Sequence, residues 1–334
     1  MKIENDKLLL NVALEGGAYT DFHLKEFPVN PVNWKTDNPE HPPLHGHFLC
    51  FDRWGPPTDA EKKLGIPLHG EVNLQTWKLL SGQNKNRKKV SMACNLPIAN
   101  LRITRTIEIP GGESIFKVNE KIENLNPGDK LYNIVQHVTI APPFLDPSVI
   151  IDTNAGKGFI NKLDGSLSQD NVIINWPEVV HLGSEIDLRQ FKSGRPLLAS
   201  FVFNEVGEYG WVTACNPSLG LLFGYLWRTC DYPWINFWSS MANGVPLAFG
   251  MEFGTTGLHE DFSIVTKKGK ILGQSLYEVI GAGGIVEKSF FCFIVKVAKG
   301  FNGVGKINYN NSFIEIKERN EFSNNVIVLN TKTS

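Results

Sequence analysis

Leu101-Arg-Ile-Thr-Arg-Thr-Ile-Glu-Ile-Pro-Gly-Gly-Glu-Ser-Ile-Phe-Lys-Val-Asn-Glu-Lys-Ile-Glu123 is the stretch that decides the fold. Apolar and polar side chains alternate with a period of two on both sides of Pro110-Gly-Gly112, as in two strands joined by a turn. Most apolar side chains of each strand share one face, which Arg105 interrupts in the first strand. The stretch therefore predicts an antiparallel hairpin.

Similar alternating segments recur along the chain, whereas amphipathic helical periodicity is nearly absent. The further strands that we expect are 131–140, 198–205, 209–214, 219–227, 246–254, 286–297, 312–318 and 324–330. No linker or internal repeat interrupts the series. We therefore predict one all-β domain over residues 1–334, a large antiparallel β-sandwich. Residues 28–65 and 141–195 are predicted to be ordered loops over the sandwich, where binding residues tend to lie.

Composition excludes several classes of function. The net charge is -1, with 33 Lys and Arg against 34 Asp and Glu, so nucleic acid is not an expected partner. The one basic run, residues 85–89, is expected to be a solvated hairpin turn. No apolar stretch reaches transmembrane length, which predicts no membrane association. Five cysteines without CxxC spacing predict reduced thiols and a cytoplasmic protein.

One carboxylate lies in an otherwise apolar strand, Pro246-Leu-Ala-Phe-Gly-Met-Glu-Phe-Gly254. The period-2 rule places Leu247, Phe249, Met251 and Phe253 on the core face. Glu252 lies on the other face, between Gly250 and Gly254, where a ligand could lie close to the sheet. A carboxylate on such an apolar surface is suited to accepting a proton near neutral pH. The alternative is a strand-edge Glu that faces solvent.

Three further polar residues are candidates for the same site. His137 shares the more polar face of its strand with Asn133 and Thr139. His69 precedes Gly70 at the entry to a strand, which leaves its imidazole accessible. Arg53 follows a His-rich and aromatic loop, and its guanidinium could donate to a hydroxyl or an anion.

The stretch from Trp227 to Trp238 is rich in aromatic residues. Trp234 and Trp238 could form an aromatic platform for a ligand. Since the same residues alternate as in a strand, they could instead fill the core. Both interpretations remain open on the sequence.

Taken in order, these segments resemble the aldose 1-epimerase (galactose mutarotase-like) superfamily, and the resemblance covers most of the chain. The matching segments are Leu10–Thr20, Asn30–Trp34, Phe48–Arg53 with Gly65–Gly70, Ile103–Ile107, Gln136-His137 and Met251–Gly254. Gln136-His-Val-Thr139 and Met251-Glu-Phe-Gly-Thr-Thr256 differ from the forms of the well-studied branch. The chain therefore resembles a divergent subfamily.

The resemblance implies a galactose mutarotase-like supersandwich and an isomerase that interconverts the anomers of a free or phosphorylated aldose. Glu252 would be the general base and His137 the general acid. Arg53 and His69 would bind the sugar, and Trp234 and Trp238 could form the platform for the apolar face of its pyranose ring. Asp231 or Asp187 could be the acidic substrate-binding residue. No metal or organic cofactor is expected, and a small carbohydrate is the expected partner. The oligomeric state stays open.

This chemistry sets a geometric expectation. Ring opening removes the proton of the anomeric hydroxyl and protonates the ring oxygen, so we expect Arg53, His69, His137 and Glu252 around one pocket. The carboxylate and the imidazole are expected roughly 5 to 8 Å apart, with the sugar between them.

Two alternatives remain. The first is a carbohydrate-binding protein on the same fold that has no catalytic activity. The second is a metal-dependent, cupin-type sugar isomerase with His41, His45 and His47 as ligands. A binding protein would need neither an acid nor a base, which favours the enzyme.

Overall fold

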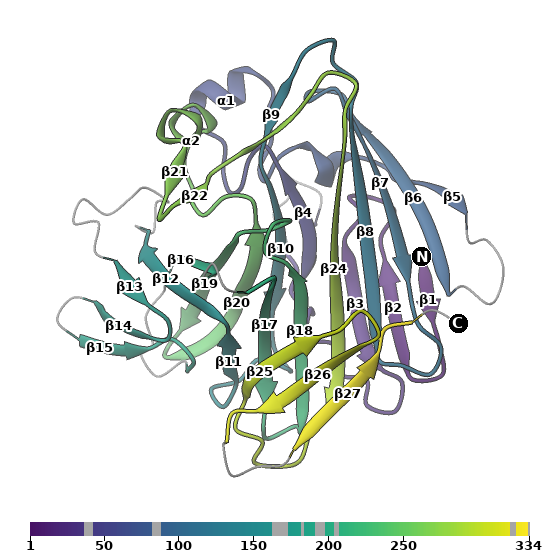
Figure 1. Ribbon diagram of the computed structural model, residues 1–334, viewed down its shortest axis with the longest axis vertical. Helices are drawn as coiled ribbons and strands as arrows, with labels where there is room; N and C mark the ends of the chain where they lie inside the picture. The colour runs from purple at the N-terminus through teal and green to yellow at the C-terminus, as the bar shows by residue number, and fades with distance from the viewer. Residues whose placement is uncertain are drawn as a thin grey trace.

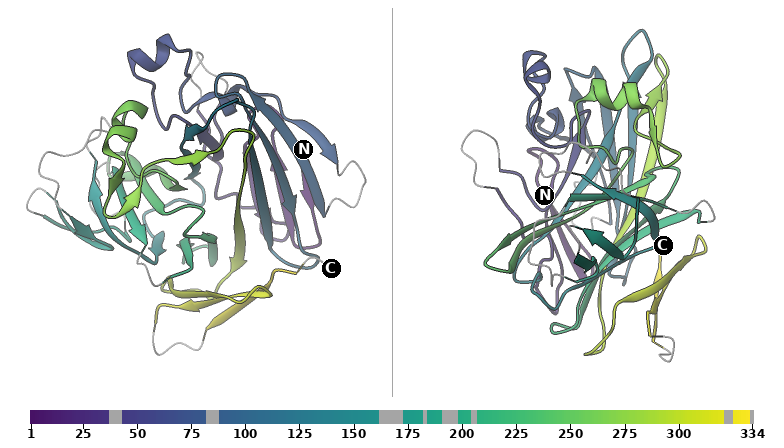
Figure 2. Two further views of the ribbon diagram at one scale, coloured as in Figure 1. Left: turned by 45° about the horizontal axis from the view of Figure 1, so that its top comes forward. Right: turned by 90° about the vertical axis from the view of Figure 1, so that its left-hand side faces the viewer.

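The computed structural model describes residues 1–36, 43–81, 88–161, 173–181, 184–190, 198–203, 207–320 and 325–332. Within these ranges β-strands dominate. The helices are short: α1 (Asp59–Lys63), α2 (Phe262–Lys268) and a 3-10 helix at Glu71–Leu74. Figure 2 shows α1 and α2 at the same end of the molecule. The prediction of an all-β protein is confirmed.

The larger of two main sheets, called sheet I, orders ten strands within the described ranges. From one edge to the other they are β1 (Lys2–Glu4), β2 (Leu8–Val12), β3 (Tyr19–Leu24), β4 (His47–Phe51), β10 (Ile134–Ile140), β20 (Val245–Gly254), β19 (Trp234–Ala242), β16 (Leu198–Phe203), β12 (Ala155–Ile160) and β13 (Ile174–Asn175). All the printed pairings between neighbours are antiparallel.

The second main sheet, sheet II, orders eight described strands. They are β11 (Ile150–Thr153), β17 (Tyr209–Asn216), β18 (Leu221–Arg228), β24 (Ile285–Lys296), β8 (Ile115–Asn124), β7 (Leu101–Glu108), β6 (Lys89–Leu96) and β5 (Lys78–Ser81). β7 and β8 pair as the expected hairpin, with Ile103 opposite Ile122. The decisive stretch of sequence therefore forms part of the middle of this sheet (Figure 1).

The main hydrophobic core lies between the two sheets. Apolar side chains from both sheets form one buried cluster. Trp227 of sheet II stacks on Phe253 of sheet I, with ring centroids 4.2 Å apart and planes 9° apart. The two sheets therefore form the predicted sandwich.

A third sheet covers part of the outer face of sheet II. Sheet III consists of β25 (Val304–Tyr309), β26 (Phe313–Glu318) and β27 (Val326–Asn330), which cross β18 and β24 near one end of the molecule (Figure 1). A second buried cluster joins the two sheets through Leu226 and Phe291 on one side and Ile307, Ile314 and Ile316 on the other.

Three pairs of short strands complete the described structure. They are β14 (Glu178–His181) with β15 (Ser184–Asp187), β21 (Lys270–Ile271) with β22 (Gln274–Ser275), and β23 (Glu278–Ile280) with β9 (Lys130–Tyr132).

Several local predictions need correction. Segment 131–140 is not one strand, because β9 pairs with β23 whereas β10 enters sheet I after Asn133. Residues 28–65 and 141–195 are not only loops, since they contain β4 and β11 to β15. The sequence analysis missed β4 because all five of its residues are buried, so the strand does not alternate between buried and exposed side chains. Leu247 is 49% exposed near the start of β20 and lies outside the core.

Two further observations bear on the predictions from composition. Among the described residues no helix is long and apolar enough to cross a membrane. The five cysteines are free, and Cys230 is exposed while the other four are buried. The basic run at 85–89 lies largely outside the described residues, but Lys89 is described and pairs with Glu108.

Candidate active site

The register of sheet I aligns a row of polar side chains on the outer face of the sandwich. His137 of β10 lies opposite Phe48 of β4, and Asn236 of β19 lies opposite Glu252 of β20. Ser200 of β16 continues the row opposite Asn236. The pairings of β10 with β20 on either side of His137 make His137 and Glu252 neighbours. Strands distant in sequence thus bring the two central candidates together (Figure 1).

Glu252 and His137 are in direct contact. His137 Nε2 lies 2.8 Å from Glu252 Oε1, and the side chains are 5% and 0% exposed. The expected gap of one sugar ring is therefore wrong for this conformation, because adjacent strands place facing side chains in contact. Glu252 Oε2 is buried and has no hydrogen-bond partner among the described residues.

Trp238 covers the carboxylate from the other side. Its Nε1 donates to Glu252 Oε1 at 2.5 Å. A Cβ built on Gly250 would lie 2.0 Å from the same indole nitrogen, so the glycine makes room for this ring rather than leaving an open surface. Trp34 meets Trp238 edge to face, with centroids 6.1 Å apart. One indole therefore contacts the Glu252 carboxylate, and a second indole packs against the first.

Aromatic rings also hold the His137 imidazole. Phe48 stacks on it at a centroid distance of 4.2 Å, and His69 lies edge-on at 4.8 Å. Thr139 Oγ1 lies 3.2 Å from His137 Nδ1. If the Thr139 hydroxyl donates to Nδ1, the proton of a neutral His137 is on Nε2 and points at Glu252. The sequence placed Thr139 on this face but did not single it out.

His69 is held as a neutral donor. The Gly55 N–H donates to His69 Nδ1 at 3.1 Å, and Cys50 Sγ lies 3.4 Å from the same atom. Burial raises the pKa of the Cys50 thiol well above its ordinary value, so the thiol stays protonated and can also donate. Because Nδ1 accepts, the imidazole proton is on Nε2. His69 has a φ of +60°, and Gly70 follows because its α-carbon approaches the Phe51 carbonyl too closely for a Cβ.

Asn236 is a site residue that the sequence analysis did not name. It is fully buried, its Nδ2 donates to the Thr256 carbonyl at 3.1 Å, and its Oδ1 has no partner among the described residues. Its position two residues before Trp238 could have indicated the shared face. The pairing with Glu252 could not be read from the sequence.

Gln136, the residue before His137, anchors β10 in the core. Gln136 Nε2 donates to Glu120 Oε2 at 2.7 Å, and Gln136 Oε1 lies 3.1 Å from His47 Nε2. Arg105 in turn donates to Glu120 Oε1 at 2.8 Å. Every member of this network is buried. Arg105, which interrupted the apolar face of its strand, is therefore paired inside the core.

His47 cannot act as the predicted metal ligand in this arrangement. Its Nδ1 lies 3.0 Å from the Tyr225 hydroxyl, and its Nε2 is engaged with Gln136. Burial lowers its pKa to about 3, which keeps the ring neutral. His45 is half-buried and forms an isolated β-bridge with Lys35. His41 lies outside the described residues.

Arg53 supports the loop rather than the row of site residues. Its guanidinium is 6% exposed and donates to the carbonyls of Pro56 and Glu260. Nε also lies 3.4 Å from Glu61 Oε2. The contacts of Arg53 therefore connect α1 with the segment after β20. They favour a structural role over binding of a sugar.

Trp234, Asp231 and Asp187 are also engaged elsewhere. Trp234 is fully buried in a side cluster and donates to the Ser275 carbonyl at 2.7 Å, so it is core and no platform. The Asp231 carboxylate accepts from the Ser289 N–H at 3.3 Å. Asp187 is exposed at the end of β15 and accepts from the Arg189 N–H.

Comparison with known proteins supports the fold. No family model matches the chain, and no curated protein matches it. Many solved structures share its architecture, and three of them illustrate the likeness. A galactose mutarotase related enzyme from Lactobacillus acidophilus is 13% identical, with a TM-score of 0.66 over 89% of this chain and 98% of that one. A galactose mutarotase-like protein from Clostridium acetobutylicum is 10% identical, with a TM-score of 0.62 over 89% and 95%. One from Lactobacillus casei is 14% identical, with a TM-score of 0.59 over 88% and 99%.

These likenesses show the fold. The protein has a sandwich of the galactose mutarotase-like fold, as the resemblance implied.

Proposed function

We propose that this protein interconverts the anomers of a free or phosphorylated aldose, as an isomerase of the aldose 1-epimerase type. The observation that carries the proposal is the contact between Glu252 and His137, with Glu252 Oε2 unpartnered among the described residues. An acid and a base meet there on a sandwich of the galactose mutarotase-like fold. A small carbohydrate is the proposed partner.

Glu252 would act as the base. Its Oε2 would take the proton of the anomeric hydroxyl while a His137 imidazolium, with its Nδ1–H donated to Thr139 Oγ1, gives the Nε2 proton to the ring oxygen, so the bond between the anomeric carbon and that oxygen breaks. The open-chain aldehyde turns about its first carbon–carbon bond, and the reverse transfers close the ring on the other face. Each positioned group contributes about 10²–10⁴-fold.

When the sugar binds, it must break the contact between Glu252 and His137 and form its own contacts with both residues. His137 Nε2 points at Glu252 Oε1 in the structure, so substrate binding would redirect this proton to the ring oxygen. His69 Nε2 and Asn236 would hydrogen-bond sugar hydroxyls, and Trp238 would cover the ring. Arg53, Asp231 and Trp234 are left out of the proposed site because their contacts lie elsewhere.

A polarimetric assay over a panel of aldoses and their 6-phosphates tests this function. We expect faster mutarotation of at least one sugar, with a bell-shaped pH profile and no loss of rate in a chelator. No acceleration with any sugar would contradict the proposal. Loss of activity in chelator, restored by a divalent ion, would instead favour the metal-dependent isomerase.

The second candidate is a carbohydrate-binding protein without catalysis. The direct contact between Glu252 and His137 favours this alternative, because the two groups bind each other in the structure with no sugar ring between them. Saturable sugar binding without anomer exchange would identify it.

A further inference from the structure

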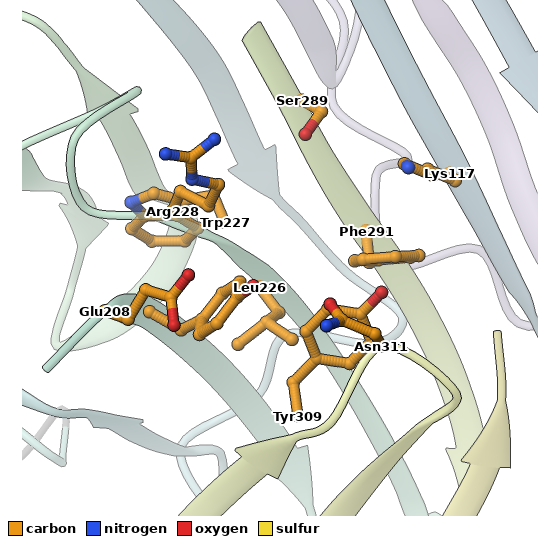
Figure 3. Close-up of a pocket in the computed structure, with 10 residues that line it drawn as sticks. Lys117, Glu208, Leu226, Trp227, Arg228, Ser289, Phe291, Tyr309 and Asn311 are labelled. Carbon is orange, nitrogen blue, oxygen red and sulfur yellow. The ribbon is translucent and has the colours of Figure 1, made fainter.

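A cavity lies on the outer face of sheet II, beside sheet III (Figure 3). Its volume is about 340 Å³, and its walls come from β8, β17, β18, β24 and the turn between β25 and β26. The candidate active site lies on the outer face of sheet I. The two sites are therefore on opposite sides of the sandwich.

The floor of this cavity is apolar and aromatic. Phe291 lies opposite Leu226 on one neighbouring strand and opposite Lys117 on the other. Tyr309 of sheet III packs 5.2 Å from the Phe291 ring and 5.2 Å from the ring of Tyr209. Such a surface suits the C–H face of a saccharide ring.

The rim carries both hydrogen-bond acceptors and cations. Arg228 lies opposite Tyr209, and Ser289, Glu208 and Asn311 complete the rim. In Figure 3 Arg228 lies on the left and Lys117 on the right, both above Leu226, and Lys117 Nζ lies 5.6 Å from the centroid of the Phe291 ring. Their strands are two spacings apart, about 9–10 Å. A ring between them could meet both cations.

The combination of charges limits the ligand. The lining has two cations and one carboxylate, and Asp231 also interacts with Arg228, so Lys117 provides the excess positive charge that favours an anion. The Tyr209 hydroxyl already hydrogen-bonds Glu208, and burial together with this carboxylate raises the pKa of Tyr209. The preference for a sugar over a simple anion therefore rests on the aromatic floor. An acidic sugar supplies both a ring and a negative charge, and the volume is sufficient for a small ligand.

We propose that this cavity is a second carbohydrate site, for a saccharide ring that carries a carboxylate or a phosphate. The proposal does not depend on catalysis at Glu252.

The test is titration of the full chain with glucuronate, glucose 6-phosphate and glucose, followed by NMR. We expect one or both acidic sugars to bind at least about tenfold more tightly than glucose, since a charge-assisted contact contributes that much. The two acidic sugars distinguish the carboxylate from the phosphate. Lys117→Met should weaken binding of the acidic sugar about tenfold.

Lys121→Met is the matched control, because Lys121 is exposed on the same face of β8, four residues along. It should leave binding unchanged, as should Glu252→Gln. Tyr309→Ala should weaken binding of the acidic sugar by removing the wall. The proposal is overturned if acidic sugars bind no better than glucose, if Lys117→Met and Lys121→Met behave alike, or if only Glu252→Gln abolishes binding.

Discussion

At the scale of single residues, the environment of Glu252 determines which chemistry the candidate site supports. Two donors, Trp238 Nε1 and His137 Nε2, meet at Oε1. The second oxygen is left for a substrate. The indole therefore orients the carboxylate so that Oε2 is the reactive atom, and Trp238 is a positioning residue in this account.

Trp238→Phe tests this role. Phenylalanine keeps a ring over Gly250 but loses the N–H donor, so we expect kcat for anomer exchange to fall about tenfold with KM nearly unchanged. The measurement is steady-state polarimetry.

Trp234→Phe is the matched control, because it also removes an indole N–H, but one that donates to the Ser275 carbonyl in the core. It should lower the free energy of unfolding by about 1 kcal/mol and leave kcat alone. An unchanged kcat in Trp238→Phe would show that the indole does not orient the base.

At the scale of elements, β10 connects the core to the site. Gln136 faces inward to Glu120 and His47, and His137 faces outward to Glu252. Alternate residues of a strand point to opposite faces of the sheet. The buried network around Gln136 therefore fixes the position of β10 and, with it, the position of His137.

This network predicts how stability depends on pH. Burial lowers the pKa of folded His47 to about 3 from an ordinary value of 6.5. The unfolded chain therefore binds the proton more readily, so the stabilisation is complete above pH 6.5 and is lost as the pH falls towards 3. From pH 7 to pH 5 the His47 contribution to the free energy of unfolding should fall by about 2 kcal/mol.

Urea unfolding at both pH values measures this loss. His47→Gln should be less stable than the wild type at pH 7, but its free energy of unfolding should change less between pH 7 and pH 5 than that of the wild type. The same pH dependence in both proteins would show that His47 is not the group responsible.

At the scale of the whole molecule, one buried carboxylate joins sheet III to sheet II. Asp152 of β11 accepts from Arg189 Nε at 2.6 Å, Arg319 Nη1 at 3.1 Å and the Val304 N–H at 2.8 Å. Gly303, the residue before Val304, has a φ of +80°. A Cβ on Gly303 would lie 2.1 Å from Asp152 Oδ2.

Asp152→Asn should lower the free energy of unfolding by about 1–3 kcal/mol, because it removes the charge that both arginines meet. The two arginines are partly exposed, so water compensates in part. Limited proteolysis should cleave sheet III more readily. Asp187→Asn, an exposed control, should change stability by less than about 0.5 kcal/mol. Equal stability of the wild type and Asp152→Asn would contradict this role.

Local periodicity was sufficient for the sandwich, the β7–β8 hairpin and the faces of His137 and Glu252. It could not supply the pairing of strands far apart in sequence, which sets the direct contact of these two residues and brings in Asn236. Nor does the sequence show whether the hydrogen-bond donors of a side chain already have partners nearby. Arg53 was therefore expected at the substrate, although main-chain carbonyls and Glu61 occupy its donors.

The most direct test of the central claim is NMR exchange between the α and β anomers of an aldose that the wild type accelerates. Glu252→Gln and His137→Asn should each lower kcat by about 10²-fold or more with little change in sugar affinity, while Asp187→Asn remains active. Wild-type exchange rates in Glu252→Gln and His137→Asn would contradict the assignment of these two residues as base and acid.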